Sequence, residues 1–491
     1  MREKYRRGKN LSVELSFSLC LLLLLVSSLY AQERFRRSPP FPEPLKELNL
    51  PGIESDQLSN GLTVTLLRRG DLRVMTMQLI VLTGESSSPE GMPGLATFTA
   101  NMVTKGAEDL PPSQVEEIME YIGGKISTST FLDYSVFTFT FLEEYVEVAL
   151  DMLSGMILRP SFLRREIDSE KRDMYYEMRE KEKDPEYIAR MHLLQLLFEG
   201  HSYRKTAYRE DFIRNISPKD VLDFFHKYYR PDNSILLFIG NLNLNTAFKK
   251  TSHYLNTWRN SSGERSSPEP PKPSLTRRVA LIDFPQEKDA TLYIGNVICF
   301  QNTQDFFPFL VLNQVLGGTP NSRLFLNLRE SKGYAYYAFS EVELFKMCGV
   351  FMIKAKVRPE VIFPSVQESL AELEKTVKEE ISSFEIEQAK SYLLGNFPLK
   401  IEKLDYFSLN MSKIIAFNLG DYFWNKYYEN IMLINAGMVF DVAQKYPIIT
   451  PVVVIVADKG RVMDYLSEFQ KIEVYDSKGV YQYSISKGAG E

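Results

Sequence analysis

The stretch GLATFTANMVTKGA, residues 94–107, is the part of the sequence on which the assignment of the fold depends. Its first ten residues, GLATFTANMV, are typical of a helix. On a helix, residues four positions apart lie on the same face. Thr97 and Asn101 therefore share a face, with Ala100 directly before Asn101.

Alternating and apolar runs on both sides of this helix predict strands, and longer amphipathic runs predict further helices. The predicted strands of this half are LTVTLLRR (62–69), VMTMQLIVLTG (74–84), SVFTFTFL (135–142) and SILLFIGNL (234–242). The predicted helices are EEYVEVALDMLSGMIL (143–158) and a long charged helix over roughly 162–182.

The same order of elements recurs later in the chain, which indicates a tandem duplication. VFDVAQKYPIITPVVVIVADKG (439–460) parallels VLDFFHKYYRPDNSILLFIGNL (221–242) almost element by element. The other predicted elements of the second half are strands at 290–300, 335–344 and 350–357 and helices at 306–318 and 361–379. The double glycine at 317–318 ends the first of these helices, because a phosphate loop would need a preceding strand and a following lysine.

The polar, Pro- and Ser-rich run that begins RNSSGERSSPEPPKPS at residue 259 lacks apolar periodicity and predicts an interdomain linker. We therefore expect a signal peptide (1–31), an N-terminal domain (32–258), a linker (259–275) and a C-terminal domain (276–491). The predicted class is α+β, with two homologous domains, each a mixed, mostly antiparallel sheet with helices packed on one face.

The first residues are typical of an export signal. Basic residues precede the apolar run LCLLLLLVSSLYA, which ends in small residues before Gln32, so we expect cleavage after Ala31. Cleavage changes the net charge from −5 to about −8, because five basic and two acidic side chains leave. An acidic chain is a poor candidate for nucleic acid or anionic membranes, and no membrane span is expected after cleavage.

The chain keeps two cysteines after cleavage, Cys299 and Cys348, both in strand-like runs. An exported protein could join them in a disulfide, and two small buried apolar residues are the alternative.

Residues 94–107 resemble the G-x-A-H-x-x-E-H-M-x-x-K-G signature of the insulinase/pitrilysin metallopeptidases. In this inverted zinc motif two histidines bind zinc and the glutamate acts as base. Thr97 and Asn101 stand at the histidine positions and Ala100 at that of the base. The resemblance covers nearly the whole chain after the signal peptide, including 162–186 and 198–233. It implies a fold like that of the mitochondrial processing peptidase, which forms half of a clamshell.

The third zinc ligand of this family is a glutamate some seventy residues downstream. The resemblance places Glu177 there, with Glu170 seven residues before it. Without histidine partners, these residues are expected on a solvated or ion-paired helix face. Zinc prefers His and Cys over hydroxyl and amide oxygens, so we expect no metal and no cofactor in this chain. His201 is expected to be a structural residue at a turn.

LGGTPNSRLFLNLRESKGYAYYAFS (316–340) resembles the segment of the family's second half that carries an arginine and a tyrosine seven residues apart. Arg329 and Tyr336 have this spacing, and such donors can hold a substrate carbonyl and stabilise an oxyanion. The alternative to this functional interpretation is that Arg329 is an ordinary charged residue at a helix end and Tyr336 is one of several tyrosines on a strand edge.

The family contains bacterial heterodimers in which one subunit keeps the zinc motif and the other keeps the Arg/Tyr pair. This chain resembles the second kind of subunit, which implies a zinc-motif partner and extended peptides as substrates, with export to the periplasm or the medium. The alternative is an inactive scaffold or peptide-binding module.

Overall fold

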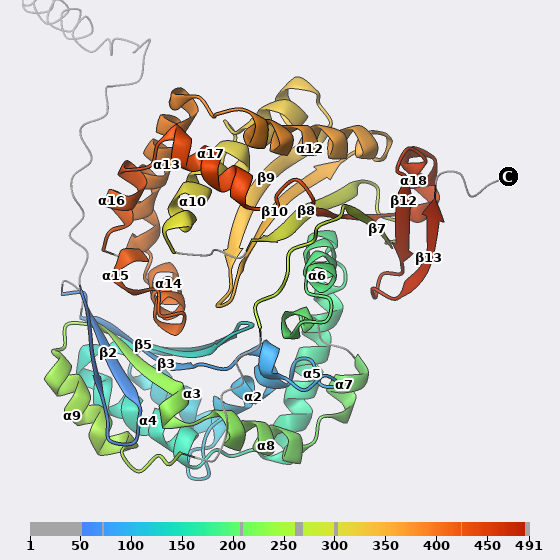
Figure 1. The fold of residues 1–491 in the computed structure, drawn as a ribbon. Coiled ribbons are helices and arrows are strands. Elements are labelled where there is room, and N and C mark those ends of the chain that lie inside the picture. Colours follow the sequence, from blue (N-terminus) through green and yellow to red (C-terminus); the bar gives the residue numbers. More distant parts are fainter. Residues whose placement is uncertain are drawn as a thin grey trace, which may run out of the picture. The chain divides into compact units, whose positions relative to one another are not determined.

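The first half of the chain builds a six-stranded sheet in the order β1-β2-β6-β3-β5-β4 (Figure 1). β2 and β6 run parallel, and the other four neighbouring pairs run antiparallel. The strands are β1 (Ile53–Gln57), β2 (Thr63–Arg68), β3 (Val74–Val81), β4 (Lys125–Thr130), β5 (Ser135–Leu142) and β6 (Ser234–Gly240). The sequence did not reveal β4, because KISTST lacks the apolar alternation of a half-buried strand.

Helices of the same half pack against one face of this sheet, where their apolar residues join those of the strands in one core. These helices are α2 (Leu95–Val103), α3 (Pro112–Tyr121), α4 (Val146–Leu158), α5 (Arg164–Lys181), α7 (Glu210–Asn215), α8 (Pro218–Tyr228) and α9 (Leu244–Leu255). The helix predicted at 94–103 is α2, and the long charged helix predicted at roughly 162–182 is α5.

The second half builds a seven-stranded sheet in the order β13-β12-β7-β11-β8-β10-β9. Its strands are β7 (Arg278–Asp283), β8 (Ala290–Ile298), β9 (Ala335–Leu344), β10 (Gly349–Val357), β11 (Val452–Ala457), β12 (Lys471–Tyr475) and β13 (Tyr481–Ser486). The run β7-β11-β8-β10-β9 repeats the run β2-β6-β3-β5-β4 of the first sheet in order. It also begins with a parallel pair and continues antiparallel. This common topology confirms the predicted α+β fold and its duplication.

The helices of the second half cover its sheet in the same way and share one apolar core with it. The helices of this core are α10 (Phe306–Gly317), α12 (Ile362–Lys378), α13 (Ser383–Glu402), α16 (Tyr427–Met432), α17 (Ala436–Lys445) and α18 (Lys459–Leu466). The remaining long helix, α14 (Leu404–Ala416), contributes no described residue to this core. The backbone N–H of Gly318 caps the end of α10, as the double glycine predicted.

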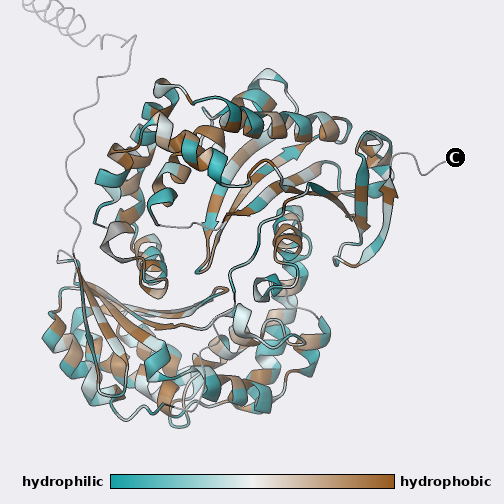
Figure 2. Ribbon diagram, viewed as in Figure 1, coloured by the Kyte–Doolittle hydropathy of each residue, from teal (hydrophilic) through white to brown (hydrophobic). Residues whose placement is uncertain are grey.

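Each sheet also carries one helix from the other half on its second face. α6 (Pro185–Leu197) packs on β8 and β11 of the second sheet, and α14 packs on β3 and β6 of the first. Figure 2 shows that the strands under these helices are largely hydrophobic. Residues on β3, β5 and β6 that point away from the first core, such as Ile80 and Leu237, join Phe407 and Met411 of α14 in a separate cluster. The two halves therefore complete each other's packing.

Replacing Phe407 by alanine tests how much the packing of α14 on the first sheet stabilises the chain. Phe407 is 4% exposed and packs in the cluster between α14 and the first sheet. Because the substitution leaves a cavity between two halves, we expect the free energy of unfolding to fall by about 3 to 5 kcal/mol. Urea denaturation followed by circular dichroism measures the change. Leu409→Ala on the same helix is the control, since Leu409 is 37% exposed and should change stability little.

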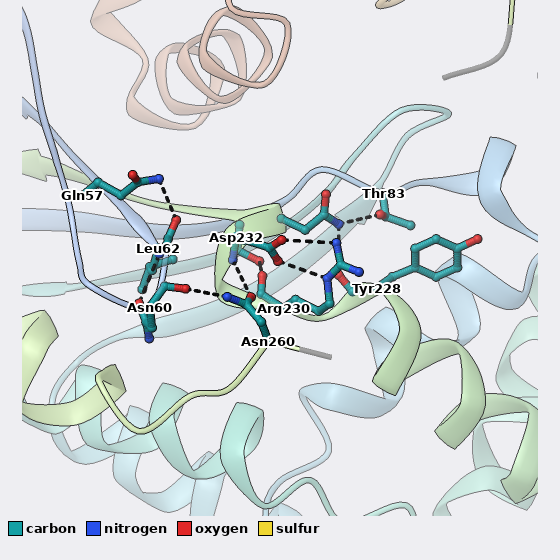
Figure 3. A network of polar contacts seen from close by, with 11 residues as sticks. Gln57, Asn60, Leu62, Thr83, Tyr228, Arg230, Asp232 and Asn260 are labelled. Atoms are coloured by element: carbon teal, nitrogen blue, oxygen red, sulfur yellow. Dashed lines mark hydrogen bonds and ion pairs between the residues drawn. The ribbon is translucent and has the colours of Figure 1, made fainter. Parts of the chain in front are cut away.

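The end of the first half is fixed by the polar network of Figure 3. The Asn60 side-chain amide donates to the carbonyl oxygens of Leu255 and Trp258, and Asn260 donates back to the Asn60 carbonyl at 2.9 Å. The backbone N–H of Asp232 donates to the Asn260 side chain at 3.2 Å. The segment just before the predicted linker is thus joined to the β1–β2 turn and to the start of β6.

The structure is a computed structural model that describes residues 52–70, 73–206, 210–260, 269–298, 303–423 and 425–486. The predicted signal peptide, its cleavage site and Cys299 lie outside these residues. Cys348 is buried next to β10, as the alternative of a small buried apolar residue predicts. The domain boundaries stay a prediction. Among the described residues, no helix combines the length and apolarity that crossing a membrane requires.

Candidate functional site

Thr97, at the first histidine position, is bound by a carboxylate from the preceding loop. Its backbone N–H and its hydroxyl both donate to Oε1 of Glu85, at 2.8 and 2.5 Å. The other carboxylate oxygen accepts from the Gly94 N–H at 2.9 Å and from the Ser88 hydroxyl at 3.0 Å. Glu85 is 7% exposed, and burial raises the pKa of this carboxyl although all four hydrogen bonds lower it. Glu85 thereby satisfies the polar groups at the start of α2.

Asn101, at the second histidine position, faces Glu170 of α5. Its side-chain amide donates to Glu170 at 2.7 Å, and the Lys105 ammonium lies 3.2 Å from the other carboxylate oxygen. Glu170 is 4% exposed, so it is ion-paired as one alternative predicted but it is not on a solvated face. Ala100 is fully buried in the first core, where its methyl group packs in place of a catalytic carboxylate.

Glu177, at the position of the third ligand, lies on the surface of α5. Its side chain is 50% exposed and pairs with Lys181 at 2.6 Å. Among the described residues, Glu177 forms no hydrogen bond or ion pair with Thr97 or Asn101. No three His, Cys, Asp or Glu side chains among the described residues gather closely enough to hold a metal ion.

The residues at these positions do not fit a zinc ion. A catalytic zinc site needs three ligands and prefers imidazole nitrogen at two of them in this motif. Here the hydroxyl of Thr97 and the amide of Asn101 are already bound to Glu85 and Glu170. A metal would have to break both contacts and would gain two weak oxygen ligands.

Arg329 and Tyr336 are exposed and lie close to one sheet edge. Arg329 lies in a π-helical turn (Leu326–Ser331), where its guanidinium stacks 4.9 Å from the Phe325 ring centroid and its side chain is 49% exposed. Its ion pair with Glu330 is long, at 3.8 Å. Tyr336 is the second residue of β9 and is 54% exposed, and its hydroxyl donates to Asp289 at 3.3 Å. No hydrogen bond joins the two side chains, but both can reach a molecule outside the chain.

The strand that carries Tyr336 is held by α6 of the other half. β9 is the last strand of its sheet, so its outer edge is free to pair with an extended peptide. The Tyr337 hydroxyl, on the opposite face from Tyr336, donates to Glu186 of α6 at 2.5 Å. Arg190 of α6 forms a hydrogen-bonded ion pair with Glu343 at 2.5 Å. These contacts fix the position of the edge relative to the first half.

His201 has the structural place expected from the sequence. Its Nδ1 accepts from the Tyr203 backbone N–H at 3.1 Å, and its Nε2 lies 3.0 Å from the carbonyl oxygen of Glu269. Sequence reasoning missed Glu85 and Glu186, the two carboxylates that hold α2 and β9. Glu85 lies in a loop rich in Ser, Gly and Pro, where no periodicity distinguishes a buried carboxylate from an exposed one.

Comparison with known proteins gives the family. The model described as insulinase (peptidase family M16) matches residues 65–211, and that of the peptidase M16 inactive domain matches residues 215–393. An uncharacterized zinc protease, YmxG of Bacillus subtilis, is 25% identical over 70% of this chain and 83% of its own length. The non-peptidase homolog YmxG of Helicobacter pylori is 24% identical over 65% of this chain and 74% of its own.

The fold agrees with a solved structure. The crystal structure of a protease from Helicobacter pylori superimposes with a TM-score of 0.76 and 21% identity, over 83% of this chain and all of that one. The two family models together cover about two thirds of the chain and follow each other directly along it. The chain therefore belongs to the insulinase family of peptidases, family M16.

Proposed function

We propose that this chain is the subunit without zinc in an exported heterodimeric zinc endopeptidase, and that it supplies Arg329 and Tyr336 to the active site of a zinc-motif partner. The observation that carries the proposal is a contrast between two sites. The polar groups at the degenerate motif are bound internally by Glu85 and Glu170. Arg329 and Tyr336 are about half exposed.

The proposed roles follow from the chemistry of the two side chains. In peptide hydrolysis, negative charge develops on the carbonyl oxygen as water adds to it. A guanidinium and a phenol hydroxyl can donate to that oxygen, and a zinc ion bound by the partner would supply the activated water. The free edge of β9 would align an extended substrate by main-chain hydrogen bonds, so we expect broad side-chain specificity. The signal-like residues 1–31 support export, with the periplasm as the proposed compartment.

Mixing the chain with a homologue from the same genome that has the complete zinc motif tests this proposal. Each subunit alone should leave an unstructured fluorogenic peptide intact, and the equimolar mixture should cleave it. Metal analysis should find stoichiometric zinc in the partner and none in this chain. A silent mixture of two folded subunits that bind each other would favour an inactive scaffold. Proteolysis and bound zinc in the isolated chain would contradict both alternatives.

A further inference from the structure

Two adjoining cavities lie between α6 and the C-terminal hairpin β12–β13, away from Arg329 and Tyr336. They measure about 820 and 420 Å³. Gln195, Arg204 and Gly479 line both of them, so the two cavities adjoin, and we call them together the hairpin cavity. Both halves of the chain contribute walls, since Gln195 belongs to α6 and Gly479 lies in the turn of the hairpin.

The acidic side chains around the hairpin cavity are already paired. Arg278 binds both Glu199 and Glu473, at 3.0 and 2.9 Å. Glu182 pairs with Arg179 at 2.8 Å. Glu210 forms an ion pair with Arg214, and Glu90 forms one with Lys205. Asp211 also interacts with another group of the chain.

Three cations of the hairpin cavity, Arg204, Lys471 and Lys478, remain without such a partner among the described residues. The side chains of Arg204 and Lys478 form no hydrogen bond or ion pair with any described residue. Arg204 is exposed, and it comes from the first half, whereas Lys478 comes from the hairpin of the second half. The walls of the two cavities together hold seven Lys and Arg side chains and six Asp and Glu side chains, so their net charge is positive. This favours an anionic occupant.

A buried imidazole marks the same space. His192 lines the smaller cavity, is 3% exposed, and its Nε2 has no hydrogen-bond partner among the described residues. Burial lowers the pKa of His192 to about 4, so the ring is neutral at pH 7, although Gln195 and the Ser477 backbone favour its charged form. A buried polar atom without a partner is costly, and a ligand group in the cavity would satisfy it.

Gly479 keeps the hairpin close to this imidazole. A Cβ atom at position 479 would lie 2.1 Å from Cε1 of His192, and the residue has a φ of +79°. Both the contact and the backbone conformation therefore require glycine. The hairpin turn forms a fixed wall of the cavity.

We propose that the hairpin cavity binds the C-terminal carboxylate of a short peptide, with Arg204 and Lys478 holding the carboxylate and the neutral polar groups of Gln195 and His192 meeting the peptide backbone. A guanidinium binds a planar carboxylate through two parallel hydrogen bonds. Apolar residues in the wall of the larger cavity could contact apolar side chains of the peptide. These wall residues are Ile188, Met191 and Val480. The choice of a peptide rests on the proposed function, because every peptide bond that a peptidase hydrolyses releases a new C-terminal carboxylate.

Fluorescence anisotropy of the isolated chain with a labelled pentapeptide of alanine and leucine tests this inference. The peptide acid should bind at least tenfold more tightly than the same peptide with a C-terminal amide, because the amide lacks the charge. Arg204→Ala and Lys478→Ala should each abolish this difference without loss of folding, since both side chains lack partners to lose. Arg159→Ala, on the surface of the first half, should preserve it.

Three results would overturn the inference. They are equal binding of acid and amide, an unchanged preference in Arg204→Ala, and binding of inorganic phosphate as tight as that of the peptide acid. The assay needs neither the partner nor turnover, so it separates the two proposals. Cleavage by the mixed subunits with equal acid and amide binding refutes the carboxylate site alone. A silent mixture with a clear carboxylate preference refutes the paired peptidase and supports the site.

Discussion

Arg329→Ala should lower kcat/KM of the mixed subunits by about 10²- to 10³-fold, the usual cost of removing one oxyanion donor. The guanidinium is half exposed, and its ion pair with Glu330 spans 3.8 Å. The variant should therefore fold normally and bind the partner as before. Peptide cleavage under conditions of limiting substrate measures the effect.

The controls separate catalysis from assembly. Arg159→Ala removes an arginine of nearly equal side-chain exposure, 51% against 49%, from a surface pair in the first half, and should leave kcat/KM unchanged. Tyr336→Phe should lower kcat/KM less than Arg329→Ala, because it removes a neutral donor. If Arg329→Ala retains full activity in a mixture that cleaves peptides, the arginine has no role in the transition state.

Glu85→Ala should destabilise the chain by about 3 to 5 kcal/mol, because it leaves several donors without an acceptor in a buried loop. These donors are the N–H groups of Gly94 and Thr97 and the hydroxyls of Ser88 and Thr97. They lie at the start of α2, so that helix should lose its fixed position. Urea denaturation gives the change in the free energy of unfolding, and hydrogen exchange at residues 94–103 locates it.

Two further variants of this loop check the cause. Glu85→Gln keeps one acceptor oxygen and should have an intermediate effect, since its NH₂ group opposes donors. Glu90→Ala removes a nearby glutamate whose side chain is 92% exposed, and should change stability by less than about 0.5 kcal/mol. Equal stability of Glu85→Ala and Glu90→Ala would show that the buried carboxylate does not hold α2.

The duplicated fold could be predicted because its signals are local and repeated. Apolar alternation located β2 and β5, and apolar runs located β3, β6 and β11. β4 escaped detection because its six residues are polar or only partly buried, and its place at the sheet edge depends on pairing with β5. The hairpin β12–β13 also went undetected, since β13 is almost wholly exposed.

The candidate site was predictable only at the level of single residues. Spacing along a helix placed Thr97 and Asn101 on one face. It could not show that Thr97 donates a hydrogen bond to Glu85 and Asn101 donates one to Glu170. Glu170 is 69 residues from Asn101 in the chain, and such contacts depend on how α2 packs against α5. The hydrogen bond from Tyr337 of β9 to Glu186 of α6 could not be predicted for the same reason, because the two residues are 151 positions apart in the chain.

α6 and α14 each pack on the sheet of the other repeat, so the two repeats depend on each other for stability. A polypeptide with one repeat alone would expose the sheet face that its sister repeat now covers, and it would gain stability by pairing with a second copy. The present chain therefore has the form of a domain-swapped dimer contained in one polypeptide.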